Sequence, residues 1–115
     1  MRDFLSVLLL GLSLAVPAAT DADAEQARKL YDAGRYDESA QAYESLIAAA
    51  PRDAALHYDL GGALFKAGRL GRAVASYERA FALDPRDLDV RYNLEFSLQR
   101  AGEEFIPSGP PPFLF

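Results

Sequence analysis

The sequence has no cysteine, no tryptophan, a single histidine and fewer basic than acidic residues. Without cysteine the fold can contain no disulfide, no thiolate metal site and no thiol nucleophile. Lysine and arginine number 12 against 17 acidic residues, for a net charge of −5, which disfavours nucleic acid and anionic membranes as partners. A catalytic cluster would have to be built around His57 and scattered carboxylates. This inventory argues against an enzyme and predicts neither a metal nor a cofactor.

No apolar run in the sequence is long enough to cross a bilayer comfortably. The longest, Phe4 to Val16, follows Arg2 and precedes a Pro-Ala-Ala segment and then polar sequence, whereas a membrane-spanning helix needs about 20 apolar residues. This pattern is typical of a secretory signal peptide at residues 1–18 and predicts an exported, periplasmic protein. Two alternatives stay open: an uncleaved anchor that contacts the membrane through residues 4–16, and a buried first helix of the domain.

The rest of the sequence repeats with a period of 34 residues. Gly34, Gly68 and Gly102 have this spacing, and the segment Pro51-Arg52-Asp53 returns as Pro85-Arg86-Asp87. A fixed period of about 20 to 50 residues indicates a solenoid, in which similar units stack on one another. Because 115 residues suffice for one small domain, the sequence predicts a short all-α solenoid.

Each period contains two segments with helical spacing. Leu56, Leu60 and Leu64 form one apolar stripe before Gly68, which suits the left-handed turn after a first helix. Pro85 ends the second helix, because the residue before proline disfavours helical angles. We therefore expect helices at residues 22–33, 37–49, 54–67, 71–83 and 88–101.

These residues resemble the tetratricopeptide repeat, a unit of 34 residues with the pattern W-x2-L-G-x2-Y, A-x3-F and P. The second repeat matches with His57-x2-Leu60-Gly61-x2-Leu64, Ala73-x3-Tyr77 and Pro85, and the first more loosely with Ala27, Leu30, Ser39-x3-Tyr43 and Pro51. The resemblance implies helix-turn-helix repeats at 20–53 and 54–87 and gives His57 a packing role. It also implies close helix crossings at four small residues, Ala27, Ser39, Gly61 and Ala73.

The third unit departs from the pattern, because Glu95 stands where a small residue belongs. We therefore expect residues 88–101 to form a capping helix or a partial third repeat. Residues 102–115 are rich in proline and predict an extended tail.

The resemblance further implies a concave binding groove lined by the first helix of each pair. Tyr58, Phe65, Tyr92 and Phe96 would form its apolar floor, and each aromatic has the alternative role of packing between repeats. A protein or peptide partner is expected, since tyrosine and arginine often carry interface energy. The full set of predicted groove residues is Arg28, Tyr31, Tyr58, Gly62, Phe65, Lys66, Tyr92, Asn93, Phe96 and Arg100, with Ala24, Asp32 and Gln99 beside them.

Two further interpretations concern the partner. Some tetratricopeptide domains hold a C-terminal carboxylate in a clamp, but the matching positions include Asp59 and Asp89, which disfavour that ligand. Residues 67–96 resemble the Bat aerotolerance proteins of bacteria, especially the BatE type, in words such as Arg91-Tyr92-Asn93-Leu94-Glu95-Phe96. That resemblance implies an envelope interaction module in a Bat-like complex. The alternative is an assembly subunit that stacks on a neighbour through Val90, Leu94 and Leu98.

Overall fold

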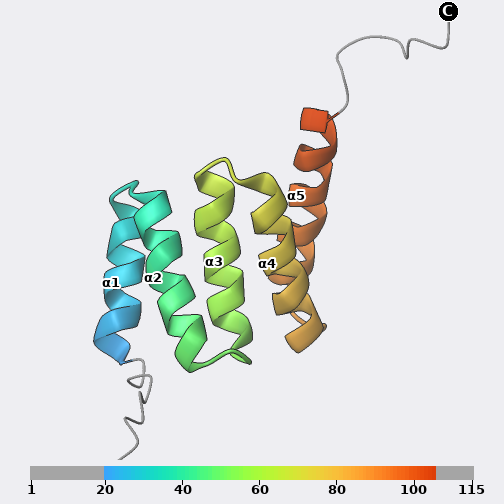
Figure 1. Ribbon diagram of the computed structural model, residues 1–115. Coiled ribbons are helices and arrows are strands. Elements are labelled where there is room, and N and C mark those ends of the chain that lie inside the picture. Colours follow the sequence, from blue (N-terminus) through green and yellow to red (C-terminus); the bar gives the residue numbers. More distant parts are fainter. Residues whose placement is uncertain (1–19, 106–115) are drawn as a thin grey trace, which may run out of the picture.

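The computed structural model describes residues 20–105 as a row of helices joined by short turns (Figure 1). The helices are α1 (Asp21–Asp32), α2 (Tyr36–Ala49), α3 (Ala54–Lys66), α4 (Leu70–Leu83) and α5 (Leu88–Phe105). Each helix packs on the next, so α1 with α2 and α3 with α4 form two hairpins, and α5 lies against α4. The predicted all-α solenoid with two hairpins and a final helix is confirmed.

Several expectations concern residues that the structure does not describe. The predicted signal segment, residues 1–18, lies outside the described range, as does the tail from residue 106 onward. Among the described helices, none combines the length and apolar character needed to span a bilayer.

Glycine ends the first helix of each hairpin. Gly34 and Gly68 have φ angles of 77° and 79°, in the left-handed region where a side chain would be strained. After α1, the Gly34 amide donates to the Tyr31 carbonyl at 2.9 Å and the Arg35 amide to the Leu30 carbonyl at 2.9 Å. The amides of Gly68 and its successor make the same pair of bonds at the end of α3. This Schellman arrangement satisfies the last carbonyls and turns the chain into the second helix.

Aspartate carboxylates accept hydrogen bonds from backbone amides at the N-terminal ends of α1, α3 and α5. At α1, the Thr20 hydroxyl accepts from the Asp23 amide at 3.2 Å while the Asp23 carboxylate accepts from the Thr20 amide at 3.0 Å, a capping box. The Asp53 carboxylate accepts from the Ala55 amide at 3.0 Å, and Asp87 accepts from the Asp89 amide at 2.9 Å. The periodic aspartates before α3 and α5 are therefore helix caps.

The last helix is longer than predicted. It continues through Gly102 to Phe105 instead of ending at residue 101, so the first residues of the expected tail are helical. Gly102 keeps the 34-residue spacing but is not among the described glycines with positive φ. It is followed by two glutamates, which favour helix.

The hairpins are held together where small residues meet. Ala27, Ser39 and Ala73 are fully buried, and the Ser39 hydroxyl donates to the Ala27 carbonyl at 2.9 Å. At Gly61, an added Cβ would lie 2.7 Å from a ring carbon of Tyr77, so the helices could not pack this closely around a larger residue. All four predicted packing positions lie within the hairpin core.

His57 packs in the core, as the sequence predicted. It is 6% exposed, and its Nε2 donates to the Pro51 carbonyl at 2.8 Å, which fixes the hydrogen on that nitrogen. Within the described residues its Nδ1 has no hydrogen-bond partner.

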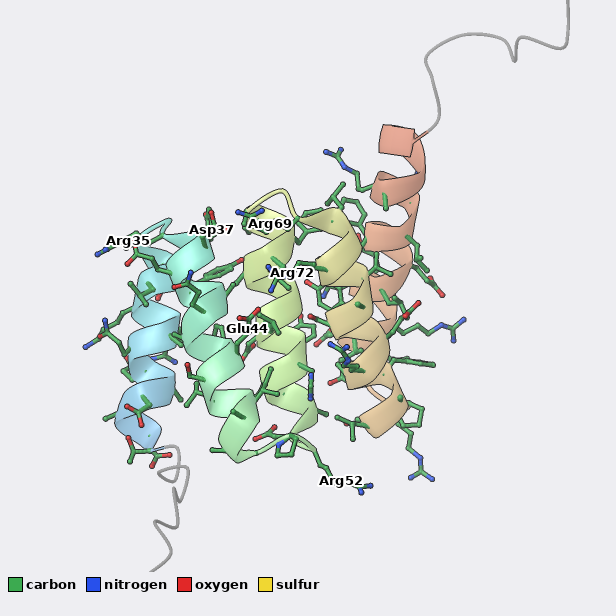
Figure 2. The ribbon with its side chains drawn as sticks, viewed as in Figure 1. Arg35, Asp37, Glu44, Arg52, Arg69 and Arg72 are labelled. Carbon is green, nitrogen blue, oxygen red and sulfur yellow. The ribbon has the colours of Figure 1, made fainter. Side chains whose placement is uncertain are left out.

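Two ion pairs connect the repeats on the face formed by the second helices (Figure 2). Arg69, which precedes α4, contacts Asp37 of α2 with an N to O distance of 2.8 Å. Arg72 of α4 pairs with Glu44 of α2. None of these four residues lines the pocket between the first helices, so the charges in that pocket are not paired with them.

Candidate functional site: a concave groove

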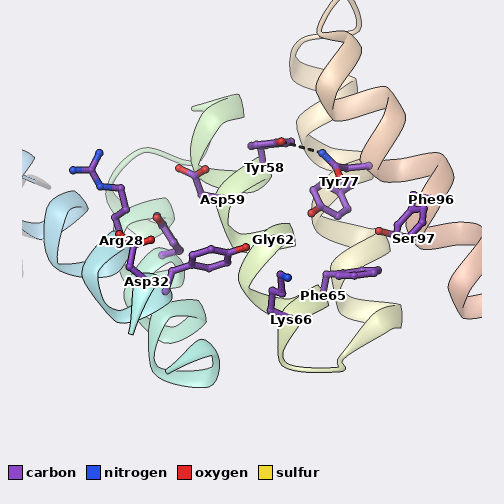
Figure 3. A pocket seen from close by; sticks show the side chains of 13 residues that line it. Arg28, Asp32, Tyr58, Asp59, Gly62, Phe65, Lys66, Tyr77, Phe96 and Ser97 are labelled. Carbon is purple, nitrogen blue, oxygen red and sulfur yellow. Dashed lines mark hydrogen bonds between the residues drawn. The ribbon is translucent and has the colours of Figure 1, made fainter. Parts of the chain in front are cut away.

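The first helices α1, α3 and α5 line one face of the solenoid, and the space between them is an open groove of about 470 Å³ (Figure 3). The second helices contribute one tyrosine each at its base. We call the following set the concave groove: Arg28, Tyr31, Asp32, Tyr43, Tyr58, Asp59, Gly62, Phe65, Lys66, Tyr77, Asn93, Phe96 and Ser97.

Helix α3 forms the middle of the groove. Its residues Tyr58, Gly62 and Phe65 follow the i, i+4, i+7 spacing that places side chains along one face of a helix. Gly62 has no side chain between the two aromatics, and an added Cβ would lie in ordinary van der Waals contact, 3.8 Å from the Tyr77 hydroxyl oxygen. The absence of a side chain lets a bound chain approach the helix backbone closely.

Tyrosines close the base of the groove. Tyr77 packs with its ring centroid 5.8 Å from that of Tyr58, and Tyr43 lies buried under the α1 side. Burial, aided by the nearby Asp59, raises the pKa of Tyr43 to about 12. Burial also raises the pKa of Tyr77 and of Tyr58. These phenols stay protonated at physiological pH and offer hydrogen-bonding groups without charge.

The α5 wall is aromatic. The Phe65 and Phe96 rings lie 5.6 Å apart and are tilted, and the Tyr92 ring stacks on Phe96 with centroids 6.3 Å apart. Phe96 remains 41% exposed although it contacts Phe65. A partly exposed ring pair of this kind can bury an apolar side chain of a ligand.

Charges of both signs line the groove. Arg28 is engaged by Glu25 on its own helix, with an N to O distance of 2.5 Å. Asp59 is half-buried, and no hydrogen bond or ion pair of its side chain is found within residues 20–105. Burial raises the pKa of Asp59, and the charge of Asp53 raises it further. Its carboxylate is therefore the groove charge most in need of a partner.

The structure brings together most of the predicted groove residues. Arg28, Tyr31, Tyr58, Gly62, Phe65, Lys66, Asn93 and Phe96 all line the groove. Tyr92 and Arg100 do not. Tyr92 is 66% exposed and stacks on the groove residue Phe96 from one turn earlier on α5, without lining the groove itself. Arg100 lines a neighbouring hollow with Leu70 and Glu103. The apolar floor therefore lacks one of the four aromatics expected in it.

Sequence reasoning missed three groove residues and weighed Asp59 only as a clamp position. Tyr43 and Tyr77 belong to second helices, whereas the groove was assigned to first helices alone. Their signal was present: they recur at the 34-residue spacing, and Tyr77 faces the small residue Gly61. Ser97, the third, is buried at 1% exposure and carried no signal.

The end of the solenoid also differs from its prediction. Val90 is 2% exposed and Leu94 packs against the core, so neither is free to meet a neighbouring molecule. A helix added at the end of a stack uses its best apolar stripe to dock on the preceding hairpin. Among the described residues, the exposed large apolar side chains are instead Leu88, Tyr92, Phe96 and Leu98, all on α5.

Within the described residues, no group of three or more histidine, cysteine or acidic side chains could hold a metal ion. What the groove offers chemically is aromatic surface, hydroxyl and amide hydrogen-bonding groups, and charges at fixed positions. These are the features of a surface that binds extended or helical segments of other proteins.

Comparisons with solved structures agree on the architecture. A double mutant described as MamA RS-1 ArsTM is 28% identical, with a TM-score of 0.67 over 70% of this chain and 45% of its own. MamA from Desulfovibrio magneticus RS-1, residues 41 to the end, is 27% identical, with a TM-score of 0.67 over 70% of this chain and 46% of its own. This chain thus spans less than half of either protein.

A third structure, the complex of the TPR2AB domain of yeast Sti1 with pHSP90, shares the fold at 22% identity. Its TM-score is 0.65, over 74% of this chain and 34% of that one. No protein with a curated description matches the chain significantly. The tetratricopeptide repeat profile matches residues 24–94, which include most of both hairpins and all groove residues except Phe96 and Ser97. The chain belongs to the tetratricopeptide repeat family.

Proposed function

We propose that this protein is a non-catalytic interaction module that holds a segment of a partner protein in its concave groove. The observation that carries the proposal is the groove itself, an open hollow of about 470 Å³ with aromatic side chains from α1, α3 and α5. The family supports it in general terms, since such repeats usually present a concave surface to proteins or peptides. The yeast Sti1 relative was solved as a complex with pHSP90.

A peptide selection tests this proposal. Residues 19–115 would be immobilised and screened against a displayed library of random peptides, and the selected peptides would be synthesised and titrated. Phe65→Ala should weaken their binding at least tenfold, because removal of a buried interface aromatic typically costs about 2 kcal/mol or more. Leu98→Ala is the matched control, since Leu98 is an exposed apolar residue outside the groove. Equal loss with both variants, or loss with neither, would contradict a groove function.

A second function, assembly through the end of the solenoid, is favoured by one observation. The exposed large apolar side chains of the described residues gather on α5, and Leu88 and Leu98 are 75% and 48% exposed. Apolar side chains gathered at one end of a stack can join two copies or continue into another repeat. Analytical ultracentrifugation across a concentration series would detect an oligomer, and Leu88→Glu with Leu98→Glu should dissociate it. A monomer at all concentrations would leave self-assembly without support.

We further propose that the module works in the bacterial envelope, within a Bat-like assembly. The support is in the sequence. It consists of the apolar run Phe4 to Val16, which is followed by small residues, and of the segments between residues 67 and 96 that resemble Bat proteins. Residues 1–25 fused to an alkaline phosphatase that is active only after export should give active enzyme in bacteria. A fusion with Leu9→Arg, which interrupts the apolar run, is the control. Activity that does not depend on this run would contradict export by a signal peptide.

A further inference from the structure

We infer that the groove selects an extended peptide that presents a basic side chain to Asp59 and, about three residues along, an apolar side chain to the Phe65 and Phe96 pair. This inference rests on the proposed function and names the chemistry of the partner. It differs from a carboxylate clamp, in which the protein supplies the cations and the ligand the acid.

The Asp59 carboxylate is half-buried in the groove and has no hydrogen bond or ion pair within the described residues. The charge that affects its pKa is that of another acid, Asp53. Arg28, a cation of the same groove, is engaged by Glu25, and Lys66 lies two helical turns away on α3. A carboxylate held out of water without a partner is destabilised in its charged form, and a cation from a ligand would relieve this.

The distance between Asp59 and Phe65 along α3 sets the spacing of the two peptide side chains. Asp59 and Phe65 are six residues apart on α3, which corresponds to about 9 Å along the helix axis at about 1.5 Å per residue. A peptide in the extended polyproline II conformation advances about 3.1 Å per residue and presents every third side chain to the same face, so about three residues cover this distance. Figure 3 shows the Asp59 and Phe65 side chains on either side of Gly62. Because Gly62 has no side chain, the peptide backbone can lie close to α3 there.

The exposure of Phe96 and the net charge of the chain favour the same kind of ligand. Phe96 is 41% exposed while its ring contacts Phe65, so a ligand side chain can still cover it. The whole chain carries a net charge of −5, which attracts basic segments and repels acidic ones during encounter. Local and long-range charges therefore favour the same partner class.

Three synthetic peptides of eight residues test the inference. The first has lysine and leucine three positions apart in a neutral background, the second has glutamate in place of the lysine, and the third has alanine in place of the leucine. Their affinities for residues 19–115 would be measured by fluorescence polarisation at low and at moderate salt. We expect the lysine and leucine peptide to bind about tenfold more tightly than either of the others.

Substitutions assign the preference to Asp59. Asp59→Asn should abolish the discrimination between lysine and glutamate, and Asp59→Lys should reverse it. Glu78→Gln is the control, because it removes one negative charge at an exposed position on α4 that does not line the groove. It should leave most of the discrimination intact. Circular dichroism and thermal unfolding of each variant would show that the fold is retained.

The outcomes separate this inference from the proposed function. Equal binding of the lysine and glutamate peptides, or equal effects of the Asp59 and Glu78 variants, overturns the inference. If none of the three designed peptides binds while library-selected peptides do bind through Phe65, the inference falls and the proposed function stands. If the selection also yields no groove-dependent peptide, both fall.

Discussion

The Asn93 side-chain amide donates a hydrogen bond of 2.9 Å to the Tyr58 hydroxyl, and so links α5 to α3 across 35 residues of sequence. The same amide also donates to the Asp89 carbonyl at 3.0 Å, one turn earlier on its own helix. Both of its hydrogens are thus used, and the side chain is held in place. This bond orients the tyrosine ring at one end of the groove and attaches the final helix to the second repeat.

Tyr58→Phe is expected to destabilise the fold by about 0.5–1.5 kcal/mol, because it removes a partly buried hydrogen bond and keeps the ring. Hydrogen exchange should quicken most in α5, the helix that this bond secures. Tyr92→Phe is the control, since Tyr92 is 66% exposed and has no hydrogen bond among the described residues. Denaturant unfolding followed by circular dichroism would give both values. A difference near zero between the variants would mean that the bond adds nothing to stability.

Glycine at position 61 is required by packing. Gly61→Ala would place a Cβ 2.7 to 3.0 Å from three ring carbons of Tyr77, which is itself buried and held between helices. We expect a loss of about 1–3 kcal/mol, the usual cost of overpacking a core.

Gly71→Ala is a matched control for this substitution. It introduces the same methyl group into a helix, in α4, where an added Cβ meets nothing within 4 Å. It should stabilise the protein by up to about 1 kcal/mol, because alanine favours helix over glycine. The two variants should therefore shift the unfolding midpoint in opposite directions. A shift of the same sign and size would show that Tyr77 yields to the extra methyl group.

The sequence predicted those parts of the fold that depend on short-range patterns. Gly34 and Gly68 adopt positive φ, as their position after an apolar stripe indicated. The same period misled at Gly102, which lies inside α5. The repeat period shows which residues recur, whereas the end of a helix also depends on whether the residues that follow favour helix. After Gly102 come helix-favouring glutamates instead of a second helix to pack.

The groove was predictable only where residues at the same position of the repeat have the same surroundings. Tyr58 and Tyr92 have the same place in the period, yet Tyr58 lies against Tyr77 of α4 and Asn93 of α5. Tyr92 belongs to α5, no later helix of the described residues covers it, and it is exposed. The isolation of Asp59 was also beyond the sequence, because it depends on distances between helices that no spacing along the chain records.

The ion pairs between α2 and α4 are expected to contribute little. Arg69 and Asp37 are 2.8 Å apart, but their side chains are 52% and 59% exposed, so solvent screens them. A double-mutant cycle with Arg69→Ala and Asp37→Ala should give a coupling of about 0.2–1 kcal/mol at low salt. The coupling should shrink toward zero in about 1 M sodium chloride, where the Debye length is about 3 Å. A coupling that is large and insensitive to salt would mean that the pair is better shielded than its exposure indicates.

Asp59 should show a conflict between stability and binding. Burial and the charge of Asp53 raise the pKa of Asp59 above its ordinary value, so the folded state binds this proton more tightly than the unfolded state does. The ionised carboxylate then lowers stability at neutral pH, and the loss is relieved as the pH falls through the raised pKa. Asp59→Asn removes the charge and keeps the shape of the side chain. It should therefore raise the unfolding midpoint at pH 7, and its advantage over the wild type should shrink steadily as the solution is made more acidic.

Thermal unfolding of both proteins from pH 7 down to pH 3 would measure this difference. Asp32→Asn, at an exposed carboxylate of the same groove, should not show this pattern. An Asp59→Asn variant that is less stable than the wild type at pH 7 would mean that the carboxylate has a stabilising partner in the folded protein. A variant that is more stable, but that no longer distinguishes a lysine from a glutamate peptide, would show that Asp59 is retained for binding at the expense of stability.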